Sequence, residues 1–146
     1  MEEIPARLSG KPSWLISQLA VHVGRMAFRG FAETGARGYH YRILASLQEF
    51  GPASQAQLGR WGRMDRSDVV AAVTQLAEQG FVERQPDPEH GRRNRVLLTE
   101  AGAAQLERMD VVLDRMQEEL LAPLPAPQRQ EFVRMLGVLL AEHDPS

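Results

Sequence analysis

Hydrophobic positions along this chain recur mostly at steps of three and four, the period that places side chains on one face of an α-helix. Within residues 12–31, the repeating positions are Ile16, Leu19, Val23, Met26 and Gly30. Their face is narrow, as in a coiled coil. The pattern predicts a long first helix with one apolar seam, ended by Gly35 and Gly38.

Two shorter helices are predicted next. Residues 39–50 form the first of them, and its inward positions are Ile43, Leu44, Leu47 and Phe50. Ser54 is a suitable N-cap for the following helix, in which Leu58 and Trp61 are the apolar pair. Gly62 suits a left-handed turn residue at the end of that helix.

A fourth helix follows this turn directly. Asp65 is its predicted N-cap, and Asp68 stands in the position of a capping-box acid. Val69, Val73 and Leu76 keep helical spacing up to Gly80, which is a suitable C′ residue. Two helices joined by a short turn that contains glycine are typical of a helix-turn-helix.

Two strand-like runs, residues 81–84 and 95–98, come after the helix-turn-helix. Asp87-Pro88 and Gly91 between them are turn formers, so a hairpin is predicted. Its tip is basic, since it carries Arg92, Arg93 and Arg95. A hairpin in this place is a wing.

The rest of the chain predicts two more helices. Thr99 can cap a helix of about 22 residues whose seam is Leu106, Met109, Leu113, Met116 and Leu120. Prolines at 123, 125 and 127 end it. The last helix has one apolar side, formed by Phe132, Met135, Leu136, Leu139 and Leu140.

The predicted fold is mainly α with a small β-hairpin wing: a winged helix-turn-helix core flanked by N- and C-terminal dimerisation helices. We divide it into residues 1–37, 38–99 and 100–146. The terminal seams are too long and narrow to be buried in one small lobe, so we expect a two-fold homodimer. The expected interface residues are Ile16, Leu19, Val23, Leu136 and Leu140.

Charge is distributed unevenly over the 146 residues. The formal net charge is −2, yet residues 54–99 carry 7 Lys+Arg against 6 Asp+Glu, while residues 100–146 carry 4 against 9. The acidic total therefore does not exclude nucleic acid as a partner of the middle segment.

Several classes of function are disfavoured by the composition. There is no cysteine, which excludes disulfides and thiolate metal sites. The four histidines, at 22, 40, 90 and 143, never stand at i,i+4 spacing, so no metal site is expected. No enzyme motif and no cofactor-binding motif is present, so we expect neither catalysis nor a cofactor. With neither a signal peptide nor a membrane span in the sequence, we expect a soluble, cytoplasmic protein.

Two runs carry a resemblance to a known family. QLGRWGRMDRSDVVAAVTQLAEQGFVER, from Gln57 to Arg84, and DPEHGRRNRVLLTEAG, from Asp87 to Gly102, resemble the winged-helix core of the MarR (multiple antibiotic resistance regulator) family. The wing carries the specific part, since Asp87, Pro88, Arg92, Leu98, Thr99 and Gly102 stand at matching offsets. The sequence departs from the family pattern in two places. His90 stands where the family has an acid. The predicted helix that begins after Asp65 corresponds to the family's recognition helix, called the reading helix below, and it lacks the basic residue that is common there.

The resemblance implies a sequence-specific regulator that binds double-stranded DNA at an imperfectly palindromic operator. Side chains at the start of the reading helix would face base edges, namely Arg66, Ser67, Val70 and Thr74. Ser54 and Gln55 would donate to phosphate. Arg92 would enter the minor groove, with His90, Arg93 and Arg95 beside the DNA backbone.

Members of this family are often repressors that a small aromatic effector releases from DNA, and we expect the same logic here. The candidate effector residues are Trp14, His22, His40 and Tyr41. Aromatic residues at helical spacing are usually packing residues, so core or interface positions are the alternative for all four. The alternative function is a winged-helix protein-protein interaction or scaffold module, which has no need of an arginine-rich hairpin tip.

Overall fold

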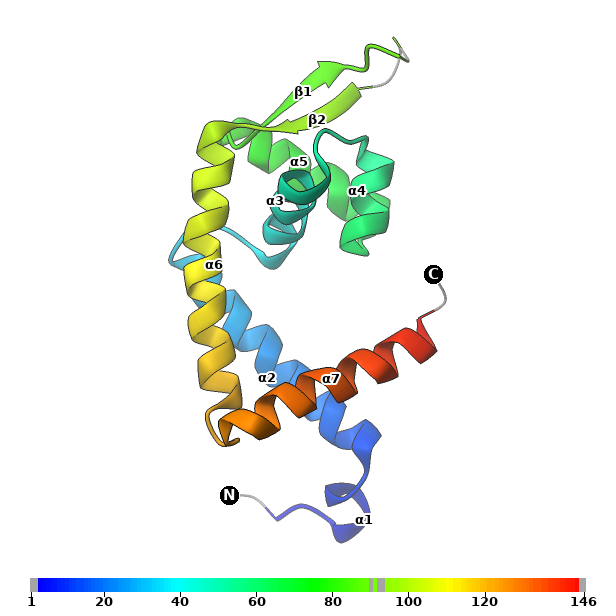
Figure 1. The fold of residues 1–146 in the computed structure, drawn as a ribbon, viewed down its shortest axis with the longest axis vertical. Coiled ribbons are helices and arrows are strands. Elements are labelled where there is room, and N and C mark those ends of the chain that lie inside the picture. The colour runs from blue at the N-terminus through cyan, green and yellow to red at the C-terminus, as the bar shows by residue number, and fades with distance from the viewer. Residues whose placement is uncertain (1–2, 90, 92–93, 145–146) are drawn as a thin grey trace.

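A computed structural model describes residues 3–89, 91 and 94–144 of the protein. In chain order the elements are α1 (Ala6–Ser9), α2 (Pro12–Ala32), α3 (Gly38–Phe50), α4 (Gln55–Gly62), α5 (Arg66–Glu78), β1 (Val82–Pro86), β2 (Asn94–Leu98), α6 (Glu100–Leu121) and α7 (Ala126–His143). Helices α3, α4 and α5 form one lobe beside the β-hairpin, and α6 runs from the hairpin to the other end, where α2 and α7 lie (Figure 1). The predicted fold class is confirmed, and the predicted elements follow in the expected order, with the short α1 as an unpredicted addition.

The wing is a two-stranded antiparallel hairpin in which Val82 pairs with Leu98 and Pro86 with Asn94. Ala53 forms a single antiparallel β-bridge with Val96 of β2. The two backbones exchange hydrogen bonds of 3.1 and 2.7 Å. The segment before α4 is thereby fixed to the hairpin. The first strand extends two residues beyond the predicted run, to Pro86.

One apolar core holds the helix-turn-helix together. Its fully buried side chains come from α3, α4, α5, the hairpin and α6: Ile43, Leu44, Leu58, Val69, Val73, Leu76, Val82, Val96 and Met109. Burial of such a side chain contributes about 1.5–3 kcal/mol. Phe31 at the end of α2 is 3% exposed and joins the same core, so the end of α2 is packed onto the lobe.

Two of the predicted helix caps are confirmed. The Ser54 hydroxyl accepts from the Gln57 amide at 3.2 Å, and the Ser54 amide donates to Gln57 Oε1 at 3.0 Å. Thr99 Oγ1 accepts from the Gly102 amide at 3.0 Å and donates to the carbonyl of Gly80 at 2.7 Å. Thr99 therefore caps α6 and ties its start to the turn between α5 and β1.

The turn between α4 and α5 differs from the sequence-based expectation. Gly62 is the last residue of α4, and Arg63 takes the left-handed conformation at φ 52°. Asp65 is the N-cap residue of α5, as predicted, but its carboxylate accepts no capping hydrogen bond from the helix, so the predicted capping box with Asp68 is wrong.

Phe50 is also misplaced by the periodicity, since it is 56% exposed rather than inward. It lies in the last turn of α3, where the helix has reached the edge of the core. Its ring packs instead on Trp61, with centroids 4.6 Å apart and the rings tilted by 40°. The pair forms an aromatic ridge on the surface of α3 and α4.

The terminal helices leave their apolar seams open in the single chain. Ile16 is 51%, Leu19 45%, Leu136 41% and Leu140 62% exposed. No residue of α7 is buried. Among the described residues, no helix is both long enough and apolar enough to cross a membrane.

Candidate nucleic-acid interface

The reading helix α5 is held at a fixed angle to α4 by backbone contacts in the turn. The Met64 amide donates to the carbonyl of Gly59 at 2.9 Å. A Cβ at Gly59 would lie 3.3 Å from the Met64 carbonyl oxygen, so the close approach favours glycine there. From α3, Arg42 Nη1 donates to the carbonyl of Gly62 at 3.2 Å. The start of α5 is thus positioned by both preceding helices.

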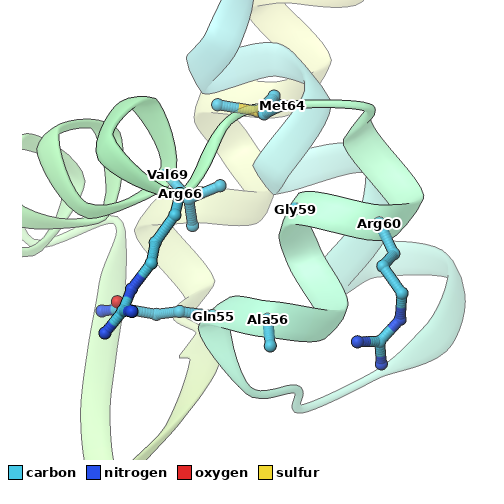
Figure 2. A pocket seen from close by; sticks show the side chains of 7 residues that line it. All are labelled: Gln55, Ala56, Gly59, Arg60, Met64, Arg66 and Val69. Carbon is cyan, nitrogen blue, oxygen red and sulfur yellow. The ribbon is translucent and has the colours of Figure 1, made fainter.

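The first turn of α5 presents Arg66, Ser67 and Val70 to solvent, and Val70 is 42% exposed although it is apolar. Beside this turn lies an open hollow of about 460 Å³ between α4 and α5. The residues that line it are Gln55, Ala56, Gly59, Arg60, Met64, Arg66 and Val69. Figure 2 shows the Arg66 side chain extending from the start of α5 toward Gln55. Three of the predicted residues therefore lie together on one surface with Gln55.

Ser54 and Gln55 differ in what they can offer to a phosphate. The hydroxyl oxygen of Ser54 is engaged in capping α4, as described above. Gln55 is half-buried, and its side chain lines both the hollow with Arg66 and a second one that reaches Asn94 of β2. Ser54 lines the second hollow as well, so both residues reach this surface, and the hydroxyl of Ser54 is the group already engaged in the helix cap.

Thr74 lies two turns further along α5 and is half-buried. Its hydroxyl accepts a hydrogen bond of 2.9 Å from Nη2 of Arg84, an exposed residue of β1. The oxygen that was expected to face DNA is thus in contact with the wing strand.

The base of the wing contributes Arg95, a half-buried residue of β2. Within the described part of the chain, its Nε atom is buried and has no hydrogen-bond partner. On the other strand, Asp87 Oδ1 accepts from the Glu89 amide at 2.9 Å and begins the turn. The predicted contacts of His90, Arg92 and Arg93 lie outside the described residues.

His40, a candidate effector residue, has both ring nitrogens engaged within the fold. Its Nδ1 accepts from the Arg37 amide at 3.3 Å, and Nε2 lies 2.8 Å from Gln75 Oε1, to which it donates as the neutral tautomer. Burial lowers the pKa of His40 below its ordinary value of 6.5, although the hydrogen bond to Gln75 acts in the opposite direction. The side chain is 4% exposed and links α3 to α5.

Tyr41 is similarly engaged between α3 and α6. Its hydroxyl donates to Asp110 Oδ1 at 2.7 Å, and its ring stacks on Phe31 with centroids 6.0 Å apart. Burial and the Asp110 carboxylate raise the pKa of Tyr41 to about 12. The phenol therefore stays protonated and acts as a donor at neutral pH.

Trp14 and His22 lie on α2, away from this cluster. At about 1.5 Å of rise per residue, Trp14 is roughly 26 Å and His22 roughly 14 Å from Phe31 along the helix. Trp14 is half-buried and His22 is exposed. A single chain therefore does not bring the four candidate effector residues into one pocket.

Sequence reasoning missed the polar partners that lie on distant elements, namely Gln75, Arg84 and Asp110. Each stands 10 to 69 positions from the residue it contacts, so no local spacing marks the pair. An arginine in a short strand beside the reading helix was the one available signal.

The helix-turn-helix, its exposed reading helix and the hairpin define a winged helix-turn-helix protein. A model of the MarR family matches residues 34–93. A probable transcriptional regulator from Pseudomonas aeruginosa has a crystal structure that covers 92% of this chain and 99% of its own, with 32% identity and a TM-score of 0.80. The chain belongs to the MarR family.

Two named repressors are also similar to this chain. The HTH-type transcriptional repressor IacR of Pseudomonas putida is 31% identical over 99 residues, which are 68% of this chain and 59% of IacR. The transcriptional repressor CouR, in a structure bound to a 23-mer DNA duplex, is 20% identical with a TM-score of 0.85 over 95% of this chain and 99% of its own. At that identity, CouR shows a common fold.

Proposed function

We propose that this protein is a homodimeric transcriptional repressor that binds a pseudo-palindromic operator in double-stranded DNA. The observation that carries the proposal is the exposed first turn of α5, where Arg66, Ser67 and Val70 stand at the edge of an otherwise buried core. A helix presented in this way can enter the major groove with its first residues near base edges. Resemblance to named repressors such as IacR supports the same role.

The distribution of charge along the chain supports the helix-turn-helix lobe as the part that faces DNA. The acidic excess of residues 100–146 lies mainly on α6, which carries six acidic against two basic side chains, whereas α7 carries two of each. The lobe of residues 38–99, with 8 Lys+Arg against 7 Asp+Glu, lacks such an excess and is the part we assign to DNA. Residues 1–37 and 100–146 are the parts we assign to dimerisation. His90, Arg92 and Arg93 keep their expected contacts as sequence-based predictions. We place the protein in the cytoplasm, as a DNA-binding regulator without a catalytic role.

We extend the proposal to release from DNA by a small aromatic effector. Trp14 and His22 have side chains that a ligand can reach, whereas the polar atoms of His40 and Tyr41 are held in the fold. Since these residues lie far apart in one chain, a site that includes both groups needs a second chain or a movement of α2.

The test is fluorescence anisotropy with a labelled random 30-bp duplex at low salt, followed by selection of tight binders from genomic fragments. Arg66→Ala should weaken selected-site binding by about 1–3 kcal/mol per half-site. Arg115→Ala, which removes the same charge from α6, should bind like the parent.

The effector proposal is tested in the same assay. Addition of 4-hydroxybenzoate should lower the affinity of the parent for DNA, and it should lower the affinity of Trp14→Ala by a smaller factor. If the parent protein binds no duplex at low salt, the result favours the alternative function, a protein-binding module.

A further inference from the structure

Arg84 occupies the inner corner between the wing and the reading helix. It pairs with Val96 across the hairpin, and it points to the same side of β1 as the buried Val82, two residues earlier. That side faces α5, against which β1 packs (Figure 1). The side chain reaches Thr74 on α5 and yet remains exposed.

The contact with Thr74 fixes the guanidinium without neutralising it. One Nη2–H is donated to the threonine hydroxyl, and a guanidinium carries five N–H donors in a rigid fork. The ion pairs formed among the described residues involve Arg63, Arg115, Arg129 and Arg134, and none of them includes Arg84. A positive charge with spare donors is therefore held at a defined place on the surface.

The geometry of a winged helix places a particular part of DNA at that corner. When a reading helix lies in the major groove and the hairpin tip in the neighbouring minor groove, the sugar-phosphate strand between the two grooves passes between α5 and the wing. We propose that Arg84 contacts a phosphate of this strand and that Thr74 is a positioning residue for Arg84. This inference rests on the proposed DNA binding. A guanidinium fork suits a phosphate because it can donate two hydrogen bonds to it.

This assignment changes the role expected of Thr74. Its hydroxyl contributes to DNA binding through Arg84 and does not read a base. Loss of the hydroxyl should therefore weaken binding to all sequences alike, since phosphate contacts carry no base information.

The experiment measures the salt dependence of binding to a random 30-bp duplex, for which phosphate contacts are sufficient. Arg84→Gln removes the charge and retains an amide that can still donate to Thr74. In a dimer it should lower the slope of log affinity against log salt by about 1.8, since each lost phosphate contact accounts for about 0.9. Arg84→Lys should keep most of the slope. Thr74→Val should weaken DNA binding and leave the slope little changed. Thr74→Ser keeps a hydroxyl and should bind DNA like the parent.

Arg115→Gln serves as the matched control, since it removes an arginine on α6 and should leave the slope unchanged. Thermal unfolding of each variant separates a loss of contact from a loss of fold. An Arg84→Gln protein that is folded and keeps the parental slope would overturn this inference and leave the proposed function intact. A parent that binds no duplex would overturn both.

Discussion

His40 shows how a single buried side chain makes the stability of this fold depend on pH. The hydrogen bond that Nδ1 accepts from the Arg37 amide requires the neutral ring, whereas Nε2 can donate to Gln75 in either protonation state, and burial lowers the pKa of His40 in the folded protein. In the unfolded chain the imidazole has its ordinary pKa, about 6.5. Between these two pKa values, the unfolded state holds more protons than the folded state.

Stability should accordingly be highest above about pH 6.5, fall as the pH drops toward the folded pKa of His40, and level off below it. Thermal unfolding of the parent between pH 8 and pH 5 measures this decline. His40→Gln should lose the part of the decline that belongs to this residue. His22→Gln, on the exposed face of α2, should retain it. Equal curves for both variants would mean that His40 is not the group responsible.

The residue roles that were predicted correctly depend on neighbours along the chain. Ser54 and Thr99 cap helices as expected, because an N-cap bonds to the backbone three residues later. The roles of His40 and Thr74 depend on Gln75 and Arg84, which the fold brings from other elements. Such contacts depend on how helices are placed against each other, so they cannot be predicted from the residues next to them in the sequence.

Elements were more predictable than contacts, because helical periodicity extends over many residues and errors at single positions do not change it. Helix α6 begins after Thr99 and spans 22 residues, as the pattern predicts. Errors occurred at the ends of elements, at Phe50 and in the turn at Arg63, where the last turn no longer faces the core. The short α1 has no apolar repeat that could have indicated it.

The junction between α6 and the wing depends on the absence of a side chain at Gly102. A Cβ there would overlap the Phe81 carbonyl oxygen and would lie 2.8 Å from Leu98 Cδ1. Since a backbone carbonyl in a packed turn cannot move aside easily, Gly102→Ala should cost at least about 1–3 kcal/mol of the free energy of unfolding.

Chemical unfolding in urea measures that loss. Gly38→Ala is the control, because a Cβ at Gly38, the first residue of α3, meets nothing within 4 Å, so this variant should be at least as stable as the parent. If both alanine variants unfold at the parental urea concentration or above, α6 is not packed against the turn as described.

At the scale of the whole molecule, the open seams of α2 and α7 make dimerisation the main expectation. Leu136→Glu and Leu140→Glu place a charge in the proposed interface, where burial without a partner is costly. Each should shift sedimentation toward the mass of one 16.3 kDa chain at micromolar concentration. Phe50→Glu changes an equally exposed large side chain outside the seams and should leave the parental sedimentation unchanged. A parent that already sediments as a monomer would contradict the expected dimer.

Helix α6 joins the two ends of the molecule as one uninterrupted rod. Its first turn is bonded to the base of the wing through Thr99 and Gly102, and its last turn leads directly to α7. At about 1.5 Å per residue the rod is roughly 33 Å long. It can therefore serve as a lever: a tilt of about 5° at the α7 end would carry the root of the wing through an arc of roughly 3 Å over that length. Two such levers, one in each copy of a dimer, would convert a small rotation at the subunit contact into a larger mismatch with the pitch of DNA.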